Sequence, residues 1–399
     1  MEKGNAEMCG HWRVDANDEA GPPHTLQVFP RLKVTSKASL LEKARQKNKK
    51  ASFYIPVKAA DKQPQLPEKE IDARLIEAFN LCRKLRVFEA YSLIEPFAYY
   101  RSVQAKISSQ PLLSKLMQVH DRFQGAIKLT MTPALRKDVA WRTITVRDPK
   151  VHKDWSLEFS LRHADESEFQ KGGPSSQVIV KTQMFNYPLS LAKYTSLCVE
   201  VDQGRKEWIE DCDFISGICG GEAKLYEGCC QMVIASSMLP FHLQETMLRA
   251  ISYCEKPPFD PGCLGESAGQ GILTVESNPP DGVKEWEGWT LPPDARKKVV
   301  KLSGTVKTIY AMPGADPGVV NVFAASRVHL PVRPFLLPLD LAKRVLADIF
   351  RKSIVRLKEK VFDRWQDFEF DARRKANPVL YKQFQDELVG AISGMHQLF

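Results

Sequence analysis

The chain has 399 residues, of which 43% are hydrophobic and 26% charged, and 57 Lys and Arg residues against 48 Asp and Glu residues give a net charge of +9. This composition is typical of a globular protein with two or three domains and excludes disorder throughout. The longest charge-free run, residues 228–244, contains Ser, Gln, His and Pro, so we expect no membrane-spanning helix. The first thirty residues lack a basic start followed by an apolar stretch, which predicts a cytoplasmic protein without a secretory signal.

Residues with reactive side chains form no pattern that indicates catalysis. The nine cysteines are an odd number without a C-x-x-C pair, so we expect buried thiols instead of disulfides or a zinc site. The eight histidines are scattered, and no G-x-S-x-G, H-E-x-x-H, Walker or dinucleotide-binding motif is present. The sequence therefore predicts no catalytic residue, no metal ligand and no cofactor, and it does not indicate an enzyme.

Positive charge is concentrated in residues 31–62, which hold ten basic and two acidic residues, a net charge of +8. The rest of the chain is close to neutral, so we expect no nucleic-acid-binding face on the folded part. Several prolines interrupt residues 1–66, and we predict a flexible basic tail there. Three interpretations stay open: a solvated tail, a tether to anionic lipid to which each basic residue contributes about 1 kcal/mol, or a segment for RNA binding or nuclear import.

Residues 67–135 are predicted to form a small helical subdomain. Ile71, Leu75 and Cys82 recur at helical spacing within 68–86, a second helix starts at Phe88, and a third is expected over 111–126. Short breaks between these segments favour antiparallel packing. We expect the subdomain to pack on the next domain, and a protein partner that binds residues 68–130 is the alternative.

From Trp155 onward the apolar period changes from helical spacing to two, which is typical of half-buried antiparallel strands. A helix is expected from Pro188 to about Val201. The strands are expected at 155–162, 178–185, 224–233, 249–254, 271–276, 299–310 and 319–330. Because helices and strands do not alternate regularly, the sequence predicts an α+β fold with a curved antiparallel sheet.

The last long helix, expected over 339–365, has the strongest apolar pattern. One stripe contains Leu346, Phe350, Ile354, Leu357, Val361 and Trp365. Basic and acidic residues lie off this stripe, so one face of the helix must be buried against a large apolar surface. Residues 367–399 are expected to be a C-terminal helical extension.

The order of these segments resembles the START (StAR-related lipid transfer) superfamily over roughly residues 150–366. The resemblance rests on VIVKTQMF, on PLSLAKYTSLCVEVDQGRKEW, on KLYEGCCQMVIASSMLP and on GADPGVVNVFAASRVHLP, which is followed by the long helix. It implies a helix-grip fold, in which a curved sheet wraps a C-terminal helix around a lipid-sized tunnel. The family commonly has Arg-Asp soon after the proline that corresponds to Pro240, whereas here an arginine follows only at Arg249.

The resemblance implies a cavity between the strands and the long helix. Small residues near Tyr226 and Met232 would leave space, and Arg327 would bind a phosphate head group if it points inward; the alternative is that it points to solvent. The predicted lining residues are Tyr226, Met232, Arg249, Tyr253, Val306, Tyr310, Phe323, Arg327, Leu346, Phe350 and Leu357.

Two loops are candidate membrane contacts. One holds Phe259 and Leu264, where the resemblance implies a gate beside the tunnel mouth. The other holds Trp286 and Trp289, which suit a water–lipid interface or, alternatively, cap the core.

The main hypothesis is therefore a lipid-binding and lipid-transfer protein that encloses one phospholipid or sterol-like molecule and touches anionic membranes transiently. A second hypothesis is an interaction scaffold with a packed interior. A third is a cyclase-like or hydrolase-like enzyme on the same fold.

Overall fold

The computed structural model describes residues 66–165, 177–200, 212–219, 228–234, 242–260, 269–280, 282–286, 289–291, 299–302, 304–316, 318–329 and 339–381. Within these ranges the strands β4, β5 and β10, and residues 242–245 of β6, are described by their backbone alone. The chain divides into two units, residues 1–55 and 56–399, and the described residues belong to the second. The predicted basic tail thus lies outside the described residues, apart from Leu66.

Four helices form the N-terminal part of the described chain: α2 (Glu68–Arg83), α3 (Val87–Ile94), α4 (Arg101–Ser109) and α5 (Pro111–Ala134). Pro111 begins α5, a position where the missing N–H costs no hydrogen bond. The helix continues beyond the predicted end at residue 126 because Ile127 and Met131 extend its buried face. The helix α4 was not predicted, since only Val103 and Ile107 of its nine residues are buried.

The described strands form a ten-stranded sheet and a separate two-stranded hairpin. The strands of the larger sheet follow the order β1-β2-β3-β12-β11-β7-β6-β5-β4. β10 lies off this path and pairs with β6, and this is the one parallel pair among the described strands. Their bounds are β1 (Arg142–Arg147), β2 (Ser156–His163), β3 (Gln177–Tyr187), β4 (Cys212–Cys219), β5 (Gly228–Ile234), β6 (His242–Cys254), β7 (Gly271–Ser277), β10 (Val299–Leu302), β11 (Val306–Pro313) and β12 (Val320–His329). The hairpin pairs β8 (Glu285–Trp286) with β9 (Trp289–Thr290).

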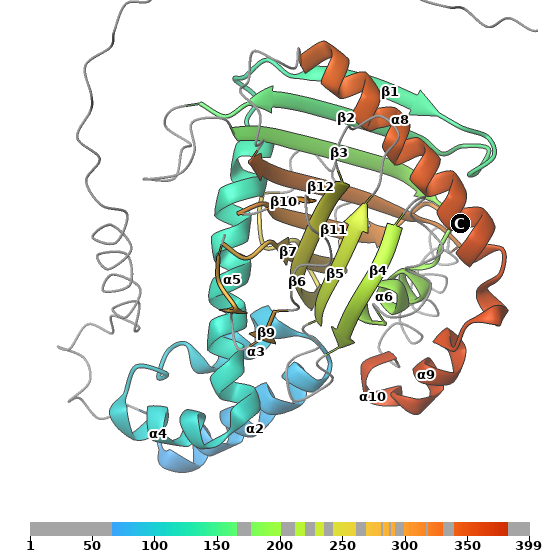
Figure 1. Cartoon of the computed structure of the whole chain (residues 1–399). Helices are drawn as coiled ribbons and strands as arrows, with labels where there is room; N and C mark the ends of the chain where they lie inside the picture. The colour runs from blue at the N-terminus through green and yellow to red at the C-terminus, as the bar shows by residue number, and fades with distance from the viewer. Residues whose placement is uncertain are drawn as a thin grey trace, which may run out of the picture. The chain divides into compact units, whose positions relative to one another are not determined.

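The sheet is strongly twisted, and β1 to β3 run across the direction of β4 to β6 (Figure 1). The predicted α+β class is confirmed, as is the antiparallel sheet that a long C-terminal helix crosses. Two long strands depart from the expectations. Residues 299–310 divide into β10 and β11, which pair with different neighbours, and β6 begins seven residues before the predicted start at Arg249.

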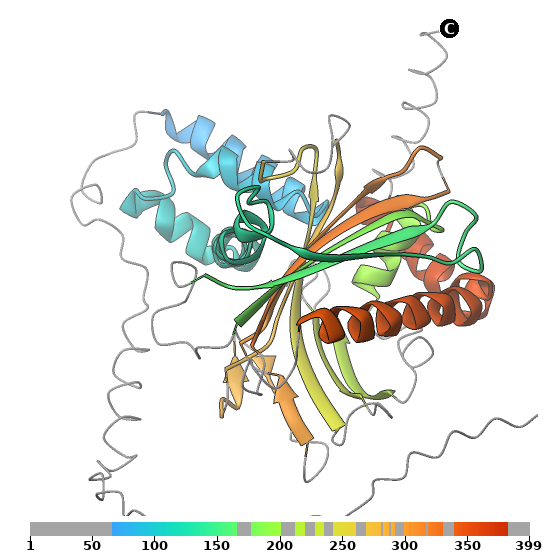
Figure 2. The same ribbon diagram turned by 90° about the horizontal axis from the view of Figure 1, so that it is seen from above.

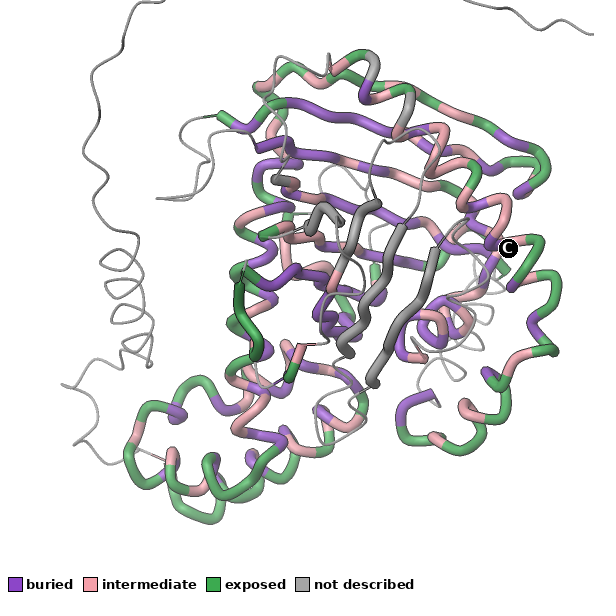
Figure 3. The backbone as a smooth tube through the Cα atoms, viewed as in Figure 1, coloured by how far each residue is buried: buried purple, intermediate pink, exposed green. Residues whose placement is uncertain are grey.

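Helices cover both faces of the sheet. On one face, here called the α5 face, strand residues such as Tyr310, Phe323 and Ala325 pack in one core with α2 to α5. On the other, the α8 face, residues such as Leu157 and Val322 pack against α6 (Leu191–Val199) and α8 (Leu339–Leu357). Figure 2 shows α5 and α8 on opposite sides of the strands. Figure 3 accordingly colours β2 and β3 largely as buried, whereas α2 is exposed over much of its length.

The C-terminal stripe is longer than one regular helix. After α8 the chain continues as a π-helix (Lys358–Phe362), a 3-10 turn (Trp365–Asp367), α9 (Phe370–Ala376) and α10 (Pro378–Tyr381). Ile354, Leu357, Val361 and Trp365 are all buried, as the stripe predicts. The regular α-helix nevertheless ends at Leu357 and not at the expected residue 365, because a wider π-turn and then a 3-10 turn follow it. The rest of the predicted terminal helix, residues 382–399, lies outside the described residues.

Among the described helices, none combines the length and the apolar character needed to cross a bilayer. A group of three or more His, Cys, Asp or Glu side chains arranged to hold a metal ion is likewise absent from the described part of the chain.

The helical subdomain contains a buried imidazole. His120 of α5 stacks on the Tyr91 ring with centroids 3.5 Å apart, meets Phe88 edge-on at 5.5 Å, and has its Nδ1 3.9 Å from a carboxylate oxygen of Asp121. Burial lowers the pKa of His120 to about 4, whereas an imidazole in the unfolded chain titrates near 6.5. The same burial raises the pKa of Asp121.

We therefore expect His120 to make folding pH-dependent. The unfolded chain takes up the proton first, so stability is complete above pH 6.5 and falls by up to about 3 kcal/mol as the pH drops toward 4. Denaturant unfolding at a series of pH values would measure this loss. His120→Phe should remove most of this loss of stability, whereas His163→Gln, at an exposed position, should leave it unchanged. If stability depends on pH equally in the wild type and both variants, His120 is not its source.

Candidate functional site

Three rows of side chains cross the α8 face, each running from strand to strand through paired residues. The first row is charged, and it contains Arg249 of β6, Glu276 of β7 and Lys307 of β11. The second contains Ile251, Thr274, Ile309, Ala324 and Thr182. The third contains Tyr253, Ile272, Ala311, Val322 and Met184.

The charged row is a buried ion cluster. The Arg249 guanidinium donates to the Glu276 carboxylate, whose second oxygen lies 3.2 Å from Nζ of Lys307. Side-chain exposure is 8% for Arg249 and 5% for Glu276, so this pair is removed from water, whereas Lys307 keeps 34%. With two cations and one carboxylate the row carries a net charge of +1, and it offers both hydrogen-bond donors and an acceptor.

The helix α6 lies over the charged row. Ser190 caps its first turn by accepting a hydrogen bond from the backbone N–H of Lys193 at 3.4 Å. At the other end Arg249 donates to the backbone oxygen of Cys198 at 3.2 Å. A cation at the carboxyl end of a helix neutralises the negative end of the helix dipole, so Arg249 stabilises α6 as well as pairing with Glu276.

The second row has small side chains on β12 and β3. Ala324 and Thr182 are paired on neighbouring strands, and both are buried, with 8% and 5% exposure. Among the side chains that the structure describes, Ala324 belongs to none of the hydrophobic clusters, although Val322 beside it does. Ala324 thus has the smallest side chain of the second row and is buried beside Thr182.

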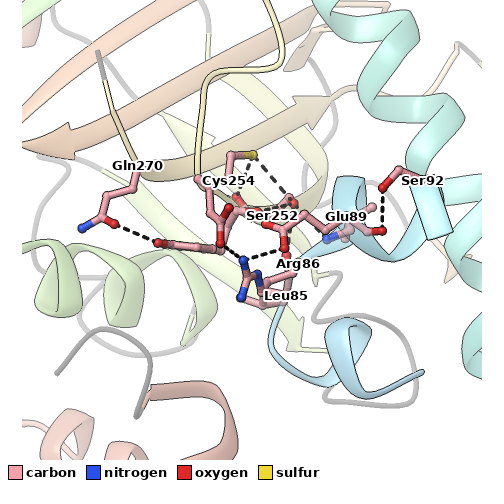
Figure 4. A network of polar contacts seen from close by, with 10 residues as sticks. Leu85, Arg86, Glu89, Ser92, Ser252, Cys254 and Gln270 are labelled. Carbon is pink, nitrogen blue, oxygen red and sulfur yellow. Dashed lines mark hydrogen bonds and ion pairs between the residues drawn. The ribbon is translucent and has the colours of Figure 1, made fainter. Parts of the chain in front are cut away.

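The third row is apolar and ends at Tyr253, which is held by residues between α2 and α3. Figure 4 shows two of these residues, Leu85 and Arg86, beside Ser252 and Cys254 of β6. The backbone N–H of Tyr253 donates to the carbonyl oxygen of Leu85 at 2.9 Å, and its hydroxyl donates to Gln270 at 3.1 Å. Arg86, which also pairs with Glu255, lies with its guanidinium carbon 5.8 Å from the centre of the Tyr253 ring. Leu85 has a φ of 60°, a strained value for a leucine, and these contacts hold it there.

Five of the predicted lining residues lie on or toward the α8 face. Arg249 and Tyr253 end the first and third rows on β6. From α8, Leu357 is buried with the third row, Phe350 contacts Phe159 with ring centroids 5.6 Å apart, and Leu346 packs over β2 and β3.

Four predicted lining residues lie on the opposite side of the sheet. Val306, Tyr310 and Phe323 pack in the core with α5, and Arg327, paired with Val306, has the same strand parity. The structure therefore does not bring these four together with α8, although it buries Arg327 to 2% exposure instead of turning it to solvent. Tyr226 lies outside the described residues, and the side chain of Met232 is not described.

The predicted membrane-contact residues differ in how far they are buried. Trp289 is buried against Leu248, while Trp286 beside it stays half-buried. Phe259 is half-buried and meets Tyr310 edge-on at 5.6 Å. Leu264 lies outside the described residues. Phe259 and Trp286 thus keep part of their side-chain surface exposed.

Sequence reasoning missed Glu276, Lys307, Thr274, Thr182 and Ala324. The signal for Glu276 was a single carboxylate within the apolar strand Gly271–Ser277. Its partners come from β6 and β11, and only the strand register brings them to it.

Comparison with known proteins gives matches among solved structures alone. No protein-family model matches the chain, and neither does any curated protein. The chain is similar to START-domain structures at low identity. The human StarD13 lipid transfer and protein localization domain is 14% identical, covers 58% of this chain and 93% of its own, and has a TM-score of 0.35. Human StAR-related lipid transfer protein 5 is 12% identical, covers 62% and 98%, and has a TM-score of 0.38. A STAR-related lipid transfer protein from Xanthomonas axonopodis is 10% identical, covers 55% and 98%, and has a TM-score of 0.32.

Proposed function

We propose that this protein binds one amphipathic lipid between the α8 face of its sheet and the helices α6 and α8, and transfers it between membranes. The observation that carries the proposal is the gradient across the three rows. The face is charged at Arg249, Glu276 and Lys307, has small side chains at Ala324 and Thr182, and is apolar in the third row. An amphipathic lipid is likewise polar at its head group and apolar along its tail, and the small side chains between the two rows would leave room for it.

The driving force would be the burial of acyl or ring surface, which contributes about 25 cal/mol for each Å² removed from water. The charged row would select the head group. Because the row holds donors and an acceptor together, it favours a neutral hydroxyl or a zwitterionic head group over an isolated anion, which would have to compete with Glu276 for its cations. No covalent step is part of this mechanism.

Contact with a membrane would use partly exposed apolar side chains near the sheet ends, Phe259 and Trp286. The basic segment 31–62 would add attraction to an anionic surface. Binding of a partner protein to the outer surface of α2 to α5 stays a prediction, since the buried sides of these helices already pack against the sheet.

We expect the full-length protein to accelerate lipid transfer between vesicles. Donor vesicles would carry a fluorescent phosphatidylcholine or a fluorescent sterol, and acceptor vesicles would contain anionic lipid. Transfer should rise in proportion to protein concentration and fall when added salt screens the basic segment. Heat-denatured protein is the control. Transfer no faster than with this control, for both lipids and at every salt concentration, would refute the proposed function.

A further inference from the structure

The segment 365–381 packs against α6 on the α8 side of the molecule, where Figure 1 shows α9 and α10 beside that helix. Arg373 of α9 donates to a carboxylate oxygen of Glu200 at 2.9 Å, and the Tyr381 hydroxyl donates to the other oxygen at 3.5 Å. Lys193 of α6 lies over the Trp365 ring at 5.1 Å.

Lys193 belongs to the first turn of α6, whereas the two bonds to Glu200 lie at its carboxyl end, where the helix is held from two directions. The backbone N–H of Glu200 closes the last turn by donating to Ser196 at 2.8 Å. The sheet contributes the bond from Arg249 to Cys198, and the C-terminal segment contributes the bonds to Glu200. Glu200 is 13% exposed and Arg373 is 32% exposed, so their ion pair is accessible enough to open and close.

The two helices that cover the α8 face differ in how firmly they are attached. The 19-residue α8 continues its buried stripe through Leu357 and Val361, and Arg351 ties it to Asp148 at 2.8 Å. The nine-residue α6 covers the charged row, and ion pairs and hydrogen bonds hold its end. Ala192, Tyr194, Cys198 and Val199 of α6 are buried as well, so α6 is not held by polar contacts alone. With nine residues against 19 it is less than half as long as α8, and we therefore expect it to open at lower cost.

We propose that residues 365–381 act as a clamp on α6, and that release of Glu200 from Arg373 lets α6 lift from the charged row during lipid exchange. This inference rests on the proposed function, because the row is then the head-group site. The clamp belongs to the C-terminal part of the chain, so lipid exchange is controlled from outside the sheet.

The test uses full-length Arg373→Gln and Glu200→Gln, with Arg364→Gln as the matched control. Arg364 directly precedes the segment, is 52% exposed and pairs with Asp367, three residues further along the chain. Breaking a partly exposed ion pair should accelerate release of a bound fluorescent lipid about threefold in both clamp variants. Hydrogen exchange at the amides of α6 should accelerate by a similar factor, while Arg364→Gln leaves both rates unchanged.

The outcomes separate the two claims. A wild-type chain that carries no lipid overturns the proposed function and with it the gating role. The clamp alone is overturned if the wild-type chain carries lipid but both clamp variants leave the rate of lipid release and the hydrogen exchange of the α6 amides unchanged. If hydrogen exchange of the α6 amides becomes faster but the rate of lipid release does not change, the clamp holds the helix without controlling lipid release. This result also overturns the proposal.

Discussion

Glu276→Gln should be among the most destabilising single substitutions in the described chain, lowering the free energy of unfolding by about 3–5 kcal/mol. Glu276 neutralises Arg249, which is 8% exposed, and also binds Lys307. The amide keeps the size of the side chain but leaves two cations beside each other with no counter-charge. Arg249→Met should cost less, because Glu276 keeps Lys307 as its partner. Denaturant unfolding at neutral pH measures both.

The control is an ion pair on the surface. Glu70 and Arg74 lie 2.9 Å apart on α2 and are 44% and 35% exposed, so Glu70→Gln should change stability by less than about 1 kcal/mol. Replacing Arg249 by Met and Glu276 by Leu together should recover much of the loss, since no buried carboxylate or arginine then lacks its partner. If Glu276→Gln unfolds at the same denaturant concentration as Glu70→Gln, the charged row is not a buried cluster.

Ala324→Phe and Ala325→Phe should have opposite effects although the residues are neighbours. Ala325 is fully buried in the core with α5, so a phenyl ring there overpacks the core and should cost about 1–3 kcal/mol. Ala324 faces the proposed lipid site, where a ring would occupy the space of the lipid. We expect Ala324→Phe to unfold near the wild-type midpoint and to lose lipid transfer, while Ala325→Phe keeps transfer at temperatures where it is folded.

The long C-terminal stripe and the two-residue period of the strands were predictable because each is a local pattern. The face to which a strand parity points was not. Helices cover both sides of β11 and β12, so Ile309 and Tyr310 both suit a buried position. The sequence therefore does not show which of the two faces α8. Val306, Tyr310, Phe323 and Arg327 were placed with α8 for this reason, whereas the structure puts them on the α5 face.

The charged row was beyond prediction for a different reason. Arg249, Glu276 and Lys307 are separated by 27 and 31 positions in the sequence, and only the register of β6, β7 and β11 aligns them. The edge strand β1 was not predicted, because its residues are mostly exposed and polar and show no alternation of buried and exposed positions. Local periodicity thus predicted many of the elements, though not α4, β1 or β4, and long-range pairing determined the site.

The central claim is that the α8 face holds a lipid instead of a solid core. Native mass spectrometry of the full-length chain, purified without detergent, tests this claim most directly. The wild-type chain should carry one additional mass that organic solvent extracts as a lipid, and Ala324→Phe should be folded and carry none. A bare wild-type chain, together with an Ala324→Phe variant destabilised as much as Ala325→Phe, would contradict the account.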